Sequence, residues 1–309
     1  MTLQRRDVNP LRNIKSKMPW WAKISAKLLL SRLPVRYEVW RRLNLFRHGA
    51  MDETAYAYGV FKYHFDRVKF PWRDDGFVGL ELGPGDSLFS AMIGWAHGAS
   101  ALYLVDTGVF ARADLNLICA MADFLVEKGL PAPKLEGVQS PEEVLAACNG
   151  RYLTAGLSSL REIPDESVDF IWSHAVLEHV KRAEFLPIMK ELRRVVRPDG
   201  VCSHLVDFRD HLGGQLNNLR FSRRFWESEL VATAGFYTNR IRYSEMLALI
   251  READFDVEVT RIDRWSTLPT PRRKLSSDFK HLPDDELCVS GFDVILHPTR
   301  QQPSFVFCG

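Results

Sequence analysis

The fold of this 309-residue chain is decided by one stretch, Leu80-Glu81-Leu82-Gly83-Pro84-Gly85-Asp86-Ser87. A mostly apolar run over residues 77–82 enters the glycines, and a helix-like sequence begins at Ser87. Glycines between a strand and a helix let backbone N–H groups approach a ligand without a side chain in the way. Asp106 follows Gly83 by 23 residues, at the end of the next predicted strand. A carboxylate there can accept hydrogen bonds from both hydroxyls of a ribose, so the pattern predicts a nucleotide-binding turn.

Two residues of this turn distinguish between ligands. A dinucleotide-binding turn has a third glycine for close packing of the helix, and Leu88 stands at that place. The carboxylate of Glu81 would repel a polyphosphate but suits a ligand that carries a positive group. The turn alone is also compatible with a simple strand–helix connection.

Strand and helix signals alternate along the rest of the chain. Strands are predicted over 101–105, 168–172, 201–208, 254–262 and 287–296, and helices over 115–125, from 140, 183–196 and 244–252. Such alternation favours an α/β fold, Rossmann-like, with a mostly parallel sheet and flanking helices. Residues 208–243 break the rhythm and are rich in Arg, Asn, Phe and Gly. An irregular segment after a strand's carboxyl end predicts an inserted substrate-binding cap over the mouth of the sheet.

Four motifs in register resemble the class I S-adenosylmethionine (SAM)-dependent methyltransferases. They are Glu81–Gly85, Val105-Asp106, the stretch 168–180 with Leu177-Glu178-His179 after the fourth strand, and residues 192–200, which end in Pro-Asp-Gly. The resemblance covers about residues 76–207, and it implies a seven-stranded sheet whose final strand is antiparallel. SAM is therefore the expected cofactor and methyl transfer the expected activity.

The resemblance also implies roles for the residues that bind the cofactor. Glu81 would lie near the amino group of the methionine moiety, Gly83 and Gly85 would place backbone against the cofactor, and Asp106 would hold the ribose. Ser173, directly after the fourth strand, would lie beside the sulfonium.

One position departs from the family pattern. Many relatives carry an acidic residue after the third strand that binds the adenine amino group, and Leu157 occupies that place here. We therefore expect Ser158 or backbone groups to contact adenine.

Methyl transfer from a sulfonium is an in-line displacement that needs positioning and, for a hydroxyl acceptor, a general base. The candidates are His211 with Asp210, which follow the fifth strand, and His174, which follows the fourth. His179 is expected to cap or pack its own helix. Asp210 and His211 have no suitably spaced third ligand, so no metal site is predicted.

Four polar residues of the cap region and its continuation are predicted to bind the acceptor: Arg220, Asn239, Arg240 and Arg242. Arginine forks recognise carboxylate or phosphate, and Asn beside aromatic rings suits sugars. The Asp-x-x-Asp-His stretch at 207–211 and the Asn-Arg-x-Arg stretch at 239–242 also resemble those of bacterial methyltransferases found with surface-polysaccharide synthesis genes. The prediction is transfer to a hydroxyl or amine of a small molecule or glycan in polysaccharide biosynthesis. A solvated loop with arginines over aromatic rings remains the alternative.

The charge is concentrated near the N-terminus. Residues 1–47 hold twelve Lys or Arg and two acidic residues, whereas the whole chain has a net charge of +2. Apolar stripes through Trp21, Ile24 and Leu28 and over 35–46 predict two short amphipathic helices. They can dock on the body or contact an anionic membrane surface near a lipid-linked acceptor. Without a reader motif, nucleic acid is the weakest candidate. We divide the chain into a basic helical arm, 1–75, and a methyltransferase domain, 76–309.

No segment is apolar for long enough to span a bilayer, and none resembles a signal peptide. The five cysteines are widely spaced and form no Cys-x-x-Cys motif. The prediction is a cytoplasmic protein, peripheral at the inner membrane face through the arm. Two other functions stay open at this point: a non-catalytic methyltransferase fold that serves as a binding partner, and a nicotinamide-dependent dehydrogenase.

Overall fold

A computed structural model describes residues 19–22, 24–25, 50–111, 114–210 and 213–299. Its centre is a seven-stranded sheet in the order β3-β2-β1-β4-β5-β7-β6. The strands are β1 Phe77–Leu82, β2 Ala99–Val105, β3 Gly150–Leu153, β4 Val168–His174, β5 Val196–Asp207, β6 Phe255–Arg264 and β7 Val289–Pro298. Strands β1 to β5 pair in parallel, and β7 runs antiparallel between β5 and β6. The expected α/β architecture with an antiparallel final strand is confirmed.

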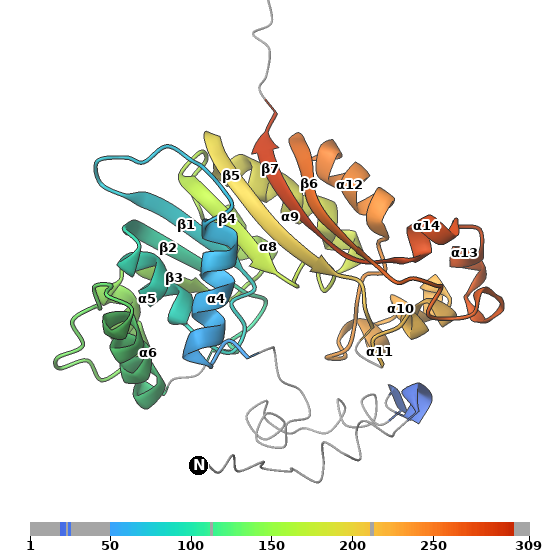
Figure 1. Cartoon of the computed structure of the whole chain (residues 1–309), viewed down its shortest axis with the longest axis horizontal. Helices are drawn as coiled ribbons and strands as arrows, with labels where there is room; N and C mark the ends of the chain where they lie inside the picture. Colours follow the sequence, from blue (N-terminus) through green and yellow to red (C-terminus); the bar gives the residue numbers. More distant parts are fainter. Residues whose placement is uncertain (1–18, 23, 26–49, 112–113, 211–212, 300–309) are drawn as a thin grey trace, which may run out of the picture.

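Helices cover both faces of the sheet (Figure 1). One face carries α4 Thr54–Phe65, α5 Phe89–Ala96, α6 Leu115–Glu127 and α7 Pro141–Ala147, and the other carries α8 Leu157–Arg161, α9 Arg182–Val195 and α12 Tyr243–Glu252. Because side chains alternate across a strand, each strand feeds both layers. In β4, Phe170 and Trp172 pack toward α4 and α5, whereas Ile171 packs toward α9.

The start of α7 follows from its sequence. Ser140 is the N-cap, and its hydroxyl accepts the backbone N–H of Glu143 at 3.3 Å. The Glu143 carboxylate reaches back to the N–H of Gln139 at 2.7 Å, one residue before the cap. Pro141 at the first helical position has no N–H to leave unpaired. The predicted helix start is confirmed.

Helix α4 lies inside the segment assigned to the arm, yet it packs on the sheet. Its residues Ala57, Val60, Phe61 and His64 are buried, and the Phe61 ring meets Trp172 edge to face at 5.4 Å. This part of 1–75 therefore covers the core. Of the two predicted arm helices, the first is helical at 20–22 and 24–25, and the second, over 35–46, lies outside the described residues.

The cap is built from two segments of chain. Residues 208–243 contribute η1 Asn217–Arg220, α10 Arg223–Trp226 and α11 Glu229–Ala232, and the β6–β7 connection contributes η2 Arg272–Lys274, α13 Ser277–Lys280 and α14 Asp284–Leu287. Leu216 and Leu219 from the first segment share a buried cluster with Leu275, Phe279 and Leu287 from the second. In Figure 1 the cap lies beside the carboxyl end of β5.

The N-terminal helix docks on this cap. Ile24 is buried in a cluster with Trp226 and Phe236, and Trp20 packs against the same cluster. In the part of the chain that the structure describes, no helix is long and apolar enough to cross a membrane.

Candidate active site

The glycine turn after β1 is held in a conformation that glycine permits. Gly83 and Gly85 have φ of +74° and +68°. The N–H of Gly83 donates to the carbonyl of Val105 at 2.8 Å, which ties the turn to the end of β2. A Cβ on Gly83 would lie 2.6 Å from Cγ2 of Val176. The loop after β4 therefore closes against the turn, and this contact requires glycine.

Glu81 has an unsatisfied buried oxygen. The residue is 2% exposed, and its Oε1 accepts the indole N–H of Trp172 at 3.2 Å. Its Oε2 is buried without a hydrogen bond of standard geometry to a described residue. Burial raises the pKa of Glu81 to about 7, although the nearby Ser90 side chain acts to lower the pKa of this carboxyl group. A buried carboxylate that lacks a partner is costly, so the site suits a ligand with a cationic donor.

Asp106 lies against the turn. Its Oδ2 accepts the N–H of Gly85 at 3.3 Å, and its Oδ1 accepts the N–H of Thr107 at 2.7 Å. The N–H of Gly156, after β3, donates to the Asp106 carbonyl at 2.8 Å. The carboxyl ends of β1, β2 and β3 are thereby joined through the carboxylate and the backbone carbonyl of Asp106. Ser158 is exposed in α8, two residues after Gly156.

The Ser173 side chain is directed toward the neighbouring strand β5. It is fully buried, and its hydroxyl lies 2.7 Å from Nδ1 of His204. Burial lowers the pKa of His204 to about 3. Ser173 therefore supports β4 and β5 through its side chain, and only its backbone remains for the predicted contact beside the cofactor.

His174, the last residue of β4, is held from α4. Its Nδ1 lies 3.2 Å from Nε2 of His64, and Nδ1 of His64 lies 2.8 Å from the hydroxyl of Ser203. Burial lowers the pKa of His174, and burial followed by the charge of His174 lowers that of His64 well below its usual value. Nε2 of His174 makes no hydrogen bond to another described residue. The chain of contacts can present a neutral imidazole that accepts a proton.

Glu178 is a residue that the sequence reasoning did not assign to the site. Its Oε1 accepts the N–H of Asp207 at 3.3 Å, and its Oε2 is buried without a hydrogen bond to a described residue. Burial raises its pKa well above the usual value. This carboxyl group lies between the ends of β4 and β5. Its position in Leu177-Glu178-His179 was the available signal. His179 itself contacts the Tyr237 carbonyl at 2.7 Å through Nδ1.

Asp210 shapes the loop that follows β5. Its Oδ1 accepts the N–H of Gly213 at 2.8 Å, and its Oδ2 accepts the N–H of Asn217 at 2.5 Å. These contacts show a carboxylate occupied by backbone donors of the cap. His211, the adjacent candidate base, lies outside the described residues.

Three of the four predicted substrate ligands lie inside the protein. The Asn239 amide donates to the carbonyls of Leu177 and Val180 at 2.8 and 3.0 Å. Arg242 is 3% exposed, and it donates through one nitrogen to the carbonyls of 286, 287 and 289. Asn239 thus fastens the cap region to the loop after β4, and Arg242 fastens it to α14 and the start of β7.

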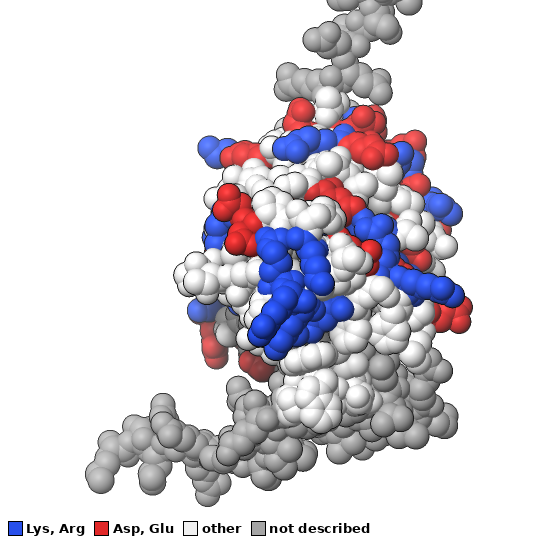
Figure 2. All heavy atoms as spheres, turned by 90° about the vertical axis from the view of Figure 1, so that its right-hand side faces the viewer, with Lys and Arg blue, Asp and Glu red and all other residues white. Residues whose placement is uncertain are grey.

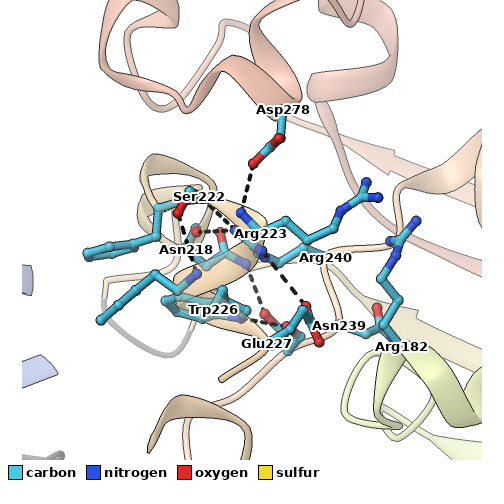
Figure 3. Close-up of polar contacts among 12 residues, drawn as sticks. Arg182, Asn218, Ser222, Arg223, Trp226, Glu227, Asn239, Arg240 and Asp278 are labelled. Atoms are coloured by element: carbon cyan, nitrogen blue, oxygen red, sulfur yellow. Dashed lines mark hydrogen bonds and ion pairs between the residues drawn. The ribbon is translucent and has the colours of Figure 1, made fainter. Parts of the chain in front are cut away.

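Arg240 lies at the centre of the cap (Figure 3). It donates to the Phe221 carbonyl at 2.7 Å, faces Glu227 at 3.8 Å and stacks over Trp226 at 5.2 Å. Burial lowers its pKa to about 10. Arg220, by contrast, is half-buried, donates to Asn217 at 2.8 Å and lies over the Trp20 ring. Of the four residues, Arg220 is the one that solvent reaches.

Comparison with known proteins agrees with this geometry. Residues 131–203, from before β3 into β5, match a family model described as a methyltransferase domain. No curated protein matches the chain.

Solved structures match the chain at low identity. The YcgJ protein from Bacillus subtilis is 15% identical, with 80% of this chain and all of that chain covered, at a TM-score of 0.42. A SAM-dependent methyltransferase from Methanosarcina mazei is 17% identical, with coverages of 74% and 96%, at 0.40. A phosphoethanolamine N-methyltransferase from Haemonchus contortus, in complex with S-adenosylhomocysteine, is 13% identical, with coverages of 79% and 53%, at 0.39.

The sheet order and the glycine turn have the arrangement of the class I methyltransferase fold, and residues 131–203 match a methyltransferase domain. SAM is the cofactor that the resemblance in the sequence implies. The residues present fit SAM. The buried Oε2 of Glu81 can accept a hydrogen bond from a cationic amino group, and the turn that only glycine fits lies beside Asp106. Within the described ranges no cluster of His, Cys, Asp or Glu could hold a metal ion.

Proposed function

We propose that the enzyme methylates a hydroxyl or amine of a small-molecule or glycan acceptor in polysaccharide biosynthesis. The imidazole of His174, at the end of β4 and in contact with His64, supports a hydroxyl or an amine as the acceptor. Both kinds of acceptor lose a proton when they gain a methyl group, and a neutral imidazole can take it. SAM supplies the methyl group.

Several residues of the chain have assigned roles in this proposal. Glu81 holds the amino group of the cofactor, Gly83 and Gly85 place backbone N–H groups against it, and Asp106 binds the ribose. Ser158 or nearby backbone contacts adenine, and the backbone of Ser173 lines the region of the sulfonium.

The base is His174, with His211 as the second candidate. When Nδ1–H of His64 donates to Ser203, Nε2 of His64 accepts from His174, and Nε2 of His174 keeps its lone pair. Asp210 acts on the loop that carries His211 rather than on the acceptor, because two backbone N–H groups already bind its oxygens.

The glycan is the finer part of the proposal. It is supported by the resemblance of residues 207–211 and 239–242 to methyltransferases of surface-polysaccharide synthesis. Arg220 is the proposed acceptor ligand, since Asn239, Arg240 and Arg242 are engaged inside the cap. The basic arm, 1–47, would keep the enzyme at the cytoplasmic membrane face near a lipid-linked acceptor.

The test is transfer of isotopically labelled methyl groups from SAM to separate panels of acceptors. The panels are lipid-linked glycan extracts, free sugars, small phenols and alcohols, and amines. Mass spectrometry of the product then locates the methyl group on oxygen, nitrogen or carbon. Labelled glycan that is absent with His174→Ala supports the proposal, and a product methylated on carbon contradicts it. Calorimetry with SAM, and with NAD as the negative control, shows that each preparation retains its cofactor site.

A further inference from the structure

The cap exposes large apolar side chains close to one another. Phe225 in α10 and Leu230 in α11 are each 36% exposed, and Trp21 of the N-terminal helix is 59% exposed. Single exposed apolar residues are normal on soluble proteins, but a group of them marks a contact surface.

Ring contacts connect α10 to the N-terminal helix. Phe225 stacks on Phe221 with ring centroids 5.4 Å apart, and Phe221 meets Trp20 at 6.0 Å. Trp21 follows Trp20 directly, and the N-terminal helix is anchored through Ile24 in the cluster that holds Val231, beside Leu230. The helix and the two cap helices thus form one surface, made of two segments far apart in the sequence.

Basic residues border this surface. Arg223 and Arg224 in α10, and Arg273 and Lys274 in η2, are all exposed. The backbone N–H of Arg223 donates to Asp278 at 2.7 Å, which joins α10 to α13, directly after η2 (Figure 3). Figure 2 shows this end of the molecule, where Lys and Arg side chains gather above a region of uncharged residues.

We infer that this surface, which we name the cap face, docks on an anionic lipid bilayer. Its members are Trp21, Arg223, Arg224, Phe225, Leu230, Arg273 and Lys274. Aromatic and aliphatic side chains enter the boundary between headgroups and acyl chains, while arginine and lysine stay at the level of the phosphates. No hydrogen bond or ion pair joins any of the four basic side chains to a described residue, and only Arg223 has a charge close enough to a described carboxylate, that of Asp278, to lower its pKa beside the larger effect of the backbone hydrogen bond. Their charge is therefore largely available to lipid phosphates.

The cap face would be a second lipid contact beside the proposed contact of the basic arm. This inference does not depend on the identity of the acceptor. Because the cap lies beside the carboxyl end of β5, docking would turn the mouth of the sheet toward the bilayer.

The experiment is vesicle co-sedimentation of the full chain. One set of vesicles is phosphatidylcholine with about one third phosphatidylglycerol, and the other is phosphatidylcholine alone. The variants are the quadruple change Arg223→Ser, Arg224→Ser, Arg273→Ser and Lys274→Ser, and the double change Phe225→Ser and Leu230→Ser. Matched controls are Lys128→Ser with Arg161→Ser, and Val126→Ser, all exposed elsewhere.

We expect binding to the anionic vesicles alone, about tenfold or more weaker in the quadruple variant and weaker in the double variant, with the controls unchanged. The inference would be overturned if the quadruple or the double variant bound the anionic vesicles as tightly as the wild type. It would also be overturned if the wild type bound neutral and anionic vesicles equally. So would absence of vesicle binding together with a dimer that the double variant converts to a monomer, because the face would then join two copies of the chain. SAM binding measured by calorimetry should be the same in all variants, which separates this result from any failure of the proposed function.

Discussion

Nδ1 of His174 lies 3.2 Å from Nε2 of His64, so the last residue of β4 is hydrogen-bonded to the helix that precedes the whole sheet in sequence. When His64 accepts this hydrogen bond, the proton of His174 is on Nδ1, so α4 would set the tautomer of the proposed base. His64 does not need to touch the acceptor for this effect and is a positioning residue.

Replacement of His174 by alanine should lower methyl transfer by about 10²–10⁴-fold, the usual contribution of a general base. SAM affinity in calorimetry should not change. Because burial lowers the pKa of His174, the rate of the native enzyme should persist below pH 6.5 and decline only at more acidic pH, where the imidazole becomes protonated.

His64→Phe should give a smaller loss of rate than His174→Ala, and it should change the decline of the rate at acidic pH. The exposed His297→Ala is the control, and equal pH profiles for native enzyme and His64→Phe would remove the positioning role.

Glu81 should couple SAM affinity to protons. Its pKa is about 7 in the free protein because of burial, and a bound cationic amino group would lower it. Binding therefore releases a proton below pH 7, so affinity should rise with pH up to about 7 and level off above it. Glu81→Gln should weaken binding by about 1.5–3 kcal/mol and remove this dependence. Calorimetry in buffers of different ionisation enthalpy measures the proton directly. A binding curve in the native protein that does not change between pH 6 and 8 would contradict the assignment.

Gly83 and Val176 should show strong coupling. Gly83→Ala places a Cβ 2.6 Å from Cγ2 of Val176 at a residue with φ of +74°. We expect a loss of about 2–4 kcal/mol in the free energy of unfolding, from left-handed strain and overpacking together. Val176→Ala removes the clashing methyl groups, so the double variant should recover the overpacking part and retain the strain. Additive losses in urea denaturation would mean that the two residues do not meet.

Periodicity and turn chemistry were enough for most of the fold. The β1 bounds match the prediction, and Ser140 with Pro141 located the start of α7, because these signals are local. Helix α4 was not predicted from the sequence. Tyr56, Tyr58 and Tyr63 lie around its buried face, so the apolar residues do not show a clear helical periodicity. Its role depends on contacts with Trp172 and Ser203, more than 100 residues away, which no local pattern reports.

The site was predictable where chemistry requires backbone, and less so where it requires side chains. Gly83, Gly85 and Asp106 lie together as expected, because a strand–turn–helix leaves few arrangements. The type of a polar residue does not show whether its side chain faces a ligand or groups inside the protein. Asn239 and Arg242 have the residue types that bind sugars and anions, but the structure uses them to satisfy buried carbonyl groups.

Arg242 gives the sharpest test of that distinction. One of its nitrogens donates to three buried carbonyls, and the guanidinium stacks over Phe208 at 4.5 Å. Arg242→Met keeps the volume but leaves these carbonyls without a donor, so the free energy of unfolding should fall by about 2–4 kcal/mol. Arg220→Met should cost less than about 1 kcal/mol, because Arg220 is half-buried and has a single hydrogen-bonded partner among the described residues. In assays with a methylated acceptor the order should reverse, with KM raised by Arg220→Met and unchanged in the folded fraction of Arg242→Met. An Arg242→Met protein of native stability with a raised KM would return Arg242 to the acceptor site, since only a guanidinium that faces the ligand can change binding without changing the fold.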